Sequence, residues 1–144
     1  MIRAVLDANV LVSAILSPKG NPARILNAWR DEKFLLLISR AILDEIGRVL
    51  RYPKIKKRHR WSEQKIQILL EDLSRLAIVT PGKLSLTIIA DDPSDNRYVE
   101  CAVEGRANYL VSGDDHLLKL GAHEDVLIVT PRVFIEVMTE EPQS

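Results

Sequence analysis

The chain has 144 residues, of which 47% are hydrophobic, 28% charged and 5% aromatic, and its formal net charge is zero. This length and balance predict one globular domain with an aliphatic core and exclude a disordered chain. No apolar run approaches the roughly 20 residues that cross a bilayer, and a lone cysteine excludes a disulfide framework or a cysteine-rich zinc site. The N-terminus is typical of a strand and not of a signal peptide, so we expect a cytoplasmic protein without membrane contacts.

Short apolar runs and helical patterns alternate along the chain. In chain order, the sequence predicts a strand at Ile2–Leu6, a helix at Ala23–Trp29, a strand at Phe34–Ile38, a helix from Ser39 to about Leu50, a helix from Ser62 to about Leu76, a strand at Ala77–Thr80, a helix from Pro93 to Glu104, strands at Tyr109–Val111 and Val126–Val129, and a helix from Pro131 to Met138. Strands that are apolar on both faces and alternate with helices predict a parallel sheet inside a three-layer α/β/α sandwich.

The charge is unevenly distributed, because residues 51–60 hold six of the 20 Lys and Arg residues and no acid. The rest of the chain therefore carries 14 basic residues against 20 acidic ones. Such a segment on an acidic domain is either a contact for a polyanion or an ordinary solvated loop. If it binds RNA, the phosphate contacts would come from five side chains with Trp61 available for stacking: Lys54, Lys56, Lys57, Arg58 and Arg60.

Two acids follow predicted strands directly. Asp7 comes after the first strand, and Asp114 comes two residues after Ser112, beyond the strand Tyr109–Val111. Ligands of open parallel sheets bind beyond the carboxyl ends of the strands, near the point where the strand order reverses. Both acids are therefore predicted at the edge of the sheet where such folds place their chemistry.

Two further acids are predicted from helical periodicity. Glu45 lies at the margin of the apolar face of its helix, whereas Asp44 points to solvent. Asp95 lies on the inward face of the helix that starts at Pro93, while Asp92 is placed where an N-cap acid would accept backbone N–H groups. An inward acid near a helix start requires a partner, for which a metal ion is the strongest option.

Convergence of these carboxylates would raise the pKa values of some of them unless a cation offset their repulsion. Oxygen ligands favour Mg²⁺ or Mn²⁺, hard ions that keep bound water, over zinc. Such an ion activates water, neutralises phosphate oxygens and stabilises a leaving oxygen, as cleavage of a phosphodiester requires. No histidine is needed as a base, although His116 begins a helix next to the site.

Four short motifs occur in a fixed order between residues 5 and 117: Val5-Leu6-Asp7-Ala8-Asn9-Val10, Leu43-Asp44-Glu45-Ile46, Asp92-Pro93-Ser94-Asp95-Asn96 with Ala102, and Leu110-Val111-Ser112-Gly113-Asp114 with Leu117. In this combination the chain resembles the PIN-domain family of nucleases, and within it the VapC-like toxins of toxin–antitoxin pairs. Asp115 departs from the pattern, because many relatives carry a basic or neutral residue there.

The resemblance implies a five-stranded parallel sheet of order 3-2-1-4-5, in a single PIN-like domain over residues 1–139 with a polar tail at residues 140–144. It implies that Asp7, Glu45, Asp95 and Asp114 form a catalytic metal site, supported by Asn9, Ser112 and Asn96. It further implies Mg²⁺- or Mn²⁺-dependent endonucleolytic cleavage of RNA that leaves 5′-phosphate and 3′-hydroxyl ends. Toxin members of the family form homodimers and are held inactive by a small antitoxin protein.

Two other functions compete with the nuclease. A domain that binds RNA or a partner without cutting is one, although such a domain has little reason to keep four converging acids. The other is a phosphatase or phospho-acceptor domain with Asp7 as nucleophile. The second acid usual for that chemistry is absent, because the residue two positions on is Asn9.

Overall fold

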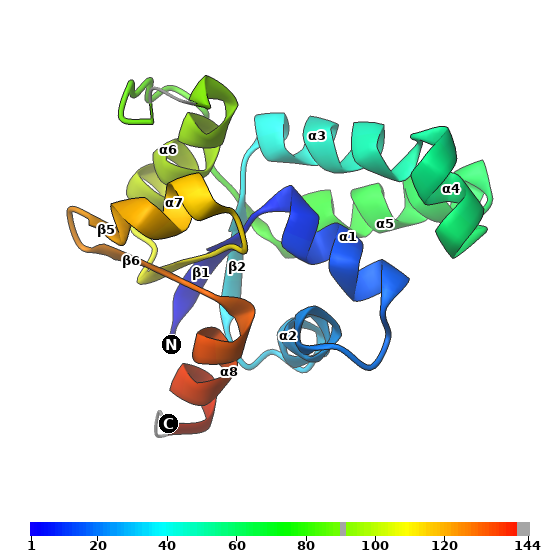
Figure 1. Ribbon diagram of the computed structural model, residues 1–144, viewed down its shortest axis with the longest axis horizontal. Helices are drawn as coiled ribbons and strands as arrows, with labels where there is room; N and C mark the ends of the chain where they lie inside the picture. The colour runs from blue at the N-terminus through cyan, green and yellow to red at the C-terminus, as the bar shows by residue number, and fades with distance from the viewer. Residues whose placement is uncertain (90–91, 141–144) are drawn as a thin grey trace.

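The computed structural model describes residues 1–89 and 92–140. It contains a mixed, mainly parallel sheet flanked by helices (Figure 1). The strands are β1 (Arg3–Leu6), β2 (Leu35–Ile38), β3 (Ile78–Val79), β4 (Tyr109–Val111), β5 (Ala122–His123) and β6 (Val126–Val129). The helices are α1 (Ala8–Leu16), α2 (Asn21–Arg30), α3 (Arg40–Leu50), α4 (Pro53–His59), α5 (Glu63–Leu76), α6 (Asn96–Glu104), α7 (Asp115–Leu120) and α8 (Pro131–Glu140), with a 3₁₀ turn, η1 (Pro93–Asp95), before α6. Within these residues no helix has the length and apolar character needed to span a bilayer.

The sheet has the order β3-β2-β1-β4-β6-β5. Its first five strands in this order are parallel, which confirms the predicted order and the α/β/α fold class. Val5 at the centre of β1 lies between Leu37 of β2 and Leu110 of β4. Strand order reverses between β1 and β4, so the carboxyl ends of these two strands form the topological switch point.

The predicted strand count was one too low. β5 is a two-residue strand that pairs antiparallel with β6 at the sheet edge. Gly121 precedes it with φ of +71°, and Glu124 turns the chain toward β6 with φ of 51°. Two residues are too few to show a strand periodicity in the sequence, so only the turn geometry reveals this hairpin.

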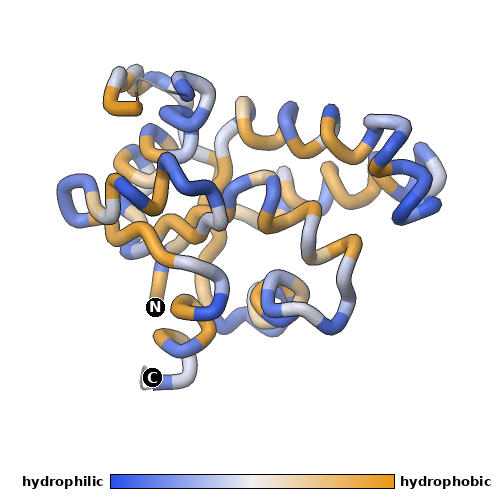
Figure 2. The backbone as a smooth tube through the Cα atoms, viewed as in Figure 1, coloured by the Kyte–Doolittle hydropathy of each residue, from blue (hydrophilic) through white to orange (hydrophobic). Residues whose placement is uncertain are grey.

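The core is aliphatic and centred on the parallel strands. Ala4 and Val5 of β1 are completely buried, and Figure 2 shows the apolar stretches of the chain turned toward the middle of the molecule. The two largest buried side chains are Phe34, just before β2, and Phe134 in α8. Their rings pack edge to face with centroids 5.1 Å apart. Burial of each such side chain contributes about 1.5–3 kcal/mol to the free energy of unfolding.

Two helices were not predicted. In α1 apolar residues occupy most positions, so the sequence shows no clear helical period, yet the helix packs against both α2 and α3. The segment expected to be a basic loop forms α4, which begins with Pro53 in its first turn and ends at Arg60 in the left-handed conformation. Its exposed side chains are nearly all basic, and hence no apolar stripe marks it as a helix. The predicted polar tail, residues 140–144, lies outside the described residues except for Glu140, which ends α8.

Candidate metal centre

Asp7 and Asp114 cap helices at the ends of neighbouring strands. Asp7 follows β1, and its Oδ1 accepts a hydrogen bond from the backbone N–H of Val10 at 2.8 Å. Asp114 follows β4, and its Oδ1 accepts hydrogen bonds from His116 N at 2.8 Å and Leu117 N at 3.3 Å. Because β1 and β4 are adjacent, the two capping carboxylates lie at the topological switch point, where the strand-end argument placed them.

Ser112 connects the two capping acids. Its hydroxyl donates a short hydrogen bond to Asp7 Oδ2 and accepts one from the backbone N–H of Asp114 at 2.9 Å. Ser112 is completely buried and Asp7 is 2% exposed. One buried hydroxyl thus sets the orientation of the Asp7 carboxylate and the position of the Asp114 backbone.

Asp95 is a buried acid, and one of its carboxylate oxygens has no hydrogen-bond partner among the described residues. It precedes α6 at the N-cap position but makes no capping hydrogen bond. The residue is only 7% exposed, and among the described residues its Oδ2 atom is buried with no hydrogen-bond donor. A buried carboxylate oxygen normally has a partner, since leaving it without one costs free energy. This unpaired oxygen is what a bound cation would satisfy.

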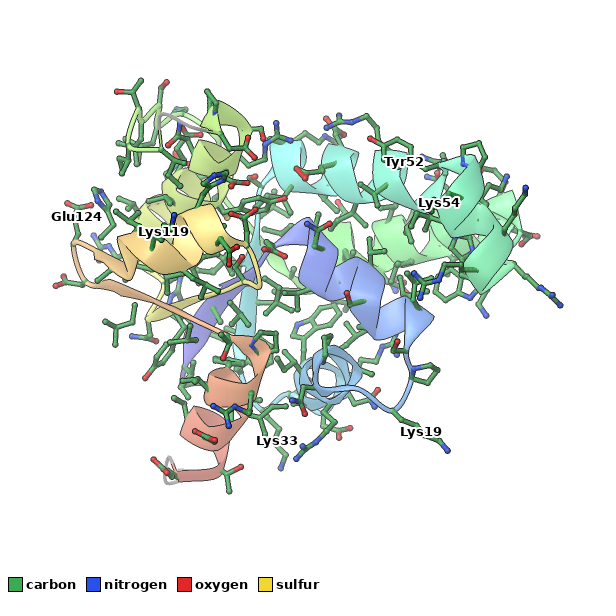
Figure 3. All side chains as sticks on the ribbon, viewed as in Figure 1. Lys19, Lys33, Tyr52, Lys54, Lys119 and Glu124 are labelled. Carbon is green, nitrogen blue, oxygen red and sulfur yellow. The ribbon has the colours of Figure 1, made fainter. Side chains whose placement is uncertain are left out.

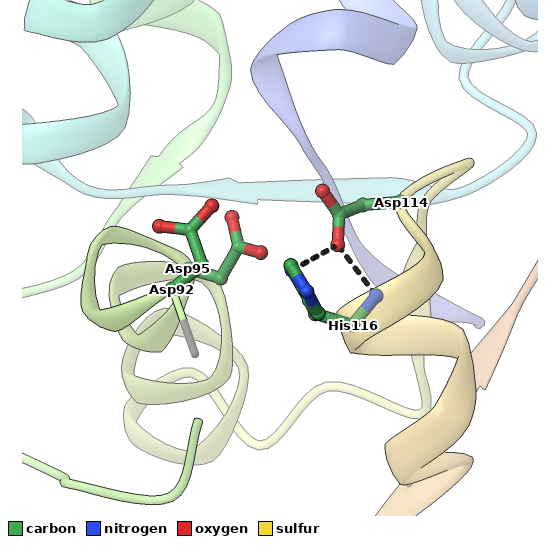
Figure 4. Close-up of side chains that lie close together, drawn as sticks. All are labelled: Asp92, Asp95, Asp114 and His116. Carbon is green, nitrogen blue, oxygen red and sulfur yellow. Dashed lines mark hydrogen bonds and ion pairs between the residues drawn. The ribbon is translucent and has the colours of Figure 1, made fainter. Parts of the chain in front are cut away.

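Asp95 belongs to a cluster of four side chains whose ligand atoms lie within 4.8 Å of one another: Asp92, Asp95, Asp114 and His116 (Figure 4). Asp92 does not cap the helix as predicted; its Oδ1 accepts a hydrogen bond from Ser94 Oγ at 2.6 Å. The reason is the 3₁₀ turn η1, because three residues per turn align positions i and i+3 on one side. The side chains of Asp92 and Asp95 therefore lie on the same side of the turn.

Burial and mutual repulsion dominate the electrostatics of the site. Burial, and next the charge of Asp114, raise the pKa of Asp95 to about 7. Burial also raises the pKa of Asp7, against the lowering effect of the hydrogen bonds from Ser112 and Val10. A cluster of several carboxylate oxygens is a suitable site for a divalent cation. The charge of a bound cation would lower the raised pKa values of Asp95 and Asp7, so that both carboxylates would be ionised.

Glu45 faces the same region, but its carboxylate forms an ion pair with an arginine side chain. Its Oε2 forms an ion pair with Arg97 Nη1 at 2.9 Å, and each side chain is about one-quarter exposed. Burial raises the pKa values of Asp7 and Tyr98, and the charge of Glu45 raises both further. The buried Tyr98 hydroxyl accepts a hydrogen bond from the N–H of Ala8 at 3.3 Å. Asp44 is exposed, as predicted. Arg97 was not predicted from the sequence, because 52 residues separate it from Glu45 and no local pattern links them.

The three polar residues expected to support the site differ in what they contact. Ser112 holds the two capping acids, as described. Asn96 is buried, and its Oδ1 accepts hydrogen bonds from the N–H groups of Ile88 and Ile89 at 3.1 and 2.9 Å, so it anchors the segment that leads into the site. Asn9 is exposed in the first turn of α1, and no hydrogen bond of its side chain is found within the described part of the chain. Asp115 is exposed on α7.

A groove of about 530 Å³ opens beside the Glu45–Arg97 pair. One wall is α3, with Arg48, and the other is formed by the 85–87 segment and the start of α6. Hydroxyl, amide and guanidinium groups line much of it, including Thr87 and Arg97. The groove thus offers polar groups to a ligand next to the acidic cluster.

The basic segment lies apart from the cluster. Figure 3 shows Tyr52 and Lys54 at the far end of the molecule from Lys119 on α7. The five basic side chains named as RNA contacts are all exposed on or next to α4: Lys54, Lys56, Lys57, Arg58 and Arg60. Trp61 is partly buried: its ring packs against the core, and the ammonium group of Lys65 lies 4.5 Å from the ring centroid.

Comparisons with known proteins agree with this architecture. A family model described as PIN domain matches residues 3–116, a span that contains every acid of the site. An uncharacterized protein of Methanocaldococcus jannaschii is 30% identical over 143 residues, which cover 94% of this chain and 90% of that protein.

Proposed function

The chain belongs to the PIN-domain family, and from this premise we propose that it is a Mg²⁺- or Mn²⁺-dependent endoribonuclease that hydrolyses RNA phosphodiester bonds. PIN domains are generally metal-dependent nucleases that act on nucleic acid. The observation that carries the proposal is the buried, unpaired Oδ2 of Asp95 among converging carboxylates. Such a buried carboxylate destabilises the metal-free protein, but at a metal-dependent active site it serves as a ligand.

In this proposal Asp7, Glu45, Asp95 and Asp114 hold the catalytic cation. A bound divalent ion supplies an activated water and neutralises charge on the phosphate and on the leaving oxygen. Ser112 maintains the spacing of Asp7 and Asp114 through its two hydrogen bonds. Arg97 positions the Glu45 carboxylate beside the site through their ion pair at 2.9 Å.

The geometry disfavours Asp7 as a nucleophile. Its carboxylate is almost completely buried, and both oxygens already accept hydrogen bonds, one from Val10 and one from Ser112. A nucleophile must reach the phosphorus of a substrate, which a 2% exposed group beneath the strand end does not. This counts against the phosphatase and phospho-acceptor reading.

We assign RNA to two surfaces of the molecule. The groove beside Arg97 and Arg48 receives the strand at the cluster. The α4 side chains then contact phosphates further along the strand, because α3, which carries Glu45, leads at its C-terminal end into α4. Exposed lysine and arginine groups provide affinity that does not depend on the base sequence.

The toxin role rests on the sequence resemblance alone. We propose that the protein is the toxin of a toxin–antitoxin pair, acts as a homodimer and is inhibited by a small partner protein. The test is whether the neighbouring gene encodes a short DNA-binding protein that copurifies with this chain and blocks its activity. A toxin would arrest growth when expressed without that partner, and absence of arrest would refute this role.

The decisive experiment separates cutting from binding. Purified protein is incubated with single-stranded and structured RNA in Mg²⁺, Mn²⁺ or EDTA, and the product ends are analysed. We expect metal-dependent cleavage to 5′-phosphate and 3′-hydroxyl ends, lost in Asp95→Asn and kept in the control Asp31→Asn, which changes an exposed acid that follows α2. Cleavage in EDTA, or cleavage by Asp95→Asn at the wild-type rate, would refute the mechanism. RNA binding without any cleavage or metal uptake would favour the non-catalytic alternative.

A further inference from the structure

His116 gives the acidic cluster a nitrogen ligand. We propose that Asp92 and His116 complete a mixed oxygen–nitrogen cation site with Asp95 and Asp114, and that this site prefers a first-row transition ion such as Mn²⁺ to Mg²⁺. The inference rests on the metal centre of the proposed function and adds two ligands and a metal preference to it.

The positions of the four side chains permit one shared ion. His116 lies in the first turn of α7, with Nδ1 at 3.7 Å from Asp114 Oδ1. All four ligand atoms are within 4.8 Å of one another, whereas opposite ligands of an ion with bonds of about 2.1 Å are about 4.2 Å apart. Small side-chain rotations therefore bring every donor into range, and Figure 4 shows the side chains facing a common point.

Two observations support a ligand site at this cluster. Asp95 presents a buried oxygen with no partner among the described residues, although it has a helix N-cap within reach. On Asp92, the Ser94 hydroxyl donates a hydrogen bond to Oδ1 at 2.6 Å, which fixes the orientation of the carboxylate within the cluster. Hydrogen-bonded partners that orient ligands in this way are usual in metal sites.

The imidazole determines the metal preference. Mg²⁺ takes oxygen ligands and releases its water reluctantly, so a nitrogen ligand adds little to its affinity. Imidazole suits transition ions, whose affinities for sites of this kind rise along the series from Mn²⁺ to Cu²⁺. The same cluster with oxygen alone would accept Mg²⁺ and Mn²⁺ more equally.

The test measures metal binding directly in the full-length protein. Titration with MnCl₂ and MgCl₂ gives the ratio of the two dissociation constants, and pulsed electron paramagnetic resonance of the Mn²⁺ complex detects nitrogen bound to the ion. We expect nitrogen coupling in the wild type and its loss in His116→Ala. That variant should bind Mn²⁺ roughly 10–100-fold more weakly, with Mg²⁺ affinity nearly unchanged.

His123→Ala is the matched control, because His123 also lies beside a carboxylate, with Nε2 3.8 Å from Glu124, but belongs to β5 at the sheet edge. It should keep the wild-type spectrum and ratio. Asp92→Asn should weaken both ions. A wild-type Mn²⁺ complex without nitrogen coupling overturns the inference, and this measurement suffices even if a variant fails to fold. If nitrogen coupling is absent but Asp95→Asn loses metal binding, the metal centre of the proposed function still holds. A wild type that binds no divalent ion would refute both the metal centre and the His116 ligand.

Discussion

Replacing Asp95 by Asn should stabilise the metal-free protein while removing its response to metal. Two like charges within 4.8 Å of each other repel by at least about 3.5 kcal/mol at an effective dielectric constant of about 20. Because Asp92 and Asp114 are partly exposed, solvent screening reduces the net relief to about 1–2 kcal/mol. Asp95 makes no capping hydrogen bond, so the change removes no contact that would offset the gain. The melting temperature in EDTA should rise by about 3–8 °C.

The sign of the pH dependence follows from the raised pKa of Asp95. Its pKa is about 7 in the folded chain and about 3.9 in the unfolded chain. The folded protein therefore binds the proton more tightly, and the free energy of unfolding of metal-free wild type should fall as pH rises from about 4 to 7. Asp95→Asn should flatten this slope. Metal binding, which displaces the proton, should strengthen as pH rises through about 7.

Scanning calorimetry at pH 8, with EDTA or with Mn²⁺, measures both effects. At a concentration 100 times the dissociation constant, a ligand adds about 2.7 kcal/mol to wild-type stability and should add almost nothing to the variant. The order of stability should thus reverse between the two conditions. Asp44→Asn, which removes an exposed charge from α3, should resemble the wild type in both. If Asp95→Asn melts below wild type in EDTA, or if Mn²⁺ stabilises it as much as wild type, Asp95 is neither a source of repulsion nor a metal ligand.

Three further variants probe the support of the site, the RNA contact and the packing of the core. Ser112→Ala deletes the hydroxyl between Asp7 and Asp114, so cleavage should fall about 10–100-fold with circular dichroism unchanged; full activity would show that Ser112 is dispensable. Lys56→Glu combined with Lys57→Glu should lower the slope of log binding constant against log salt by about 1.4 for single-stranded RNA, and an unchanged slope would reject α4 as a contact. Gly105→Ala should lower the free energy of unfolding in urea by about 1–3 kcal/mol, because an added Cβ would lie 2.7 Å from Leu37 Cδ1; equal stability would mean that Leu37 repacks freely.

Local patterns identified most of the elements around the site. The strands Tyr109–Val111 and Val126–Val129 were predicted with their observed bounds, and Ser39 caps α3 as expected, with its hydroxyl accepting the N–H of Ile42. These features depend on neighbours a few residues away, which the sequence displays directly. In contrast, α1 and α4 lack a mixed apolar and polar period, and β5 is too short to have one. Periodicity carries no information in such segments.

The sequence by itself determined where acids stand relative to strand ends and helix starts, because capping and alternation are local rules. Only the tertiary structure decided which side chains face one another. It brought Asp92 and His116 to Asp95 and Asp114, and it placed Arg97 against Glu45. The first result depends on a 3₁₀ turn in place of an α-helical one, and the second on the packing of α6 beside α3. Such contacts join residues far apart in the chain, so their energies appear only when the sheet has set the distances between elements.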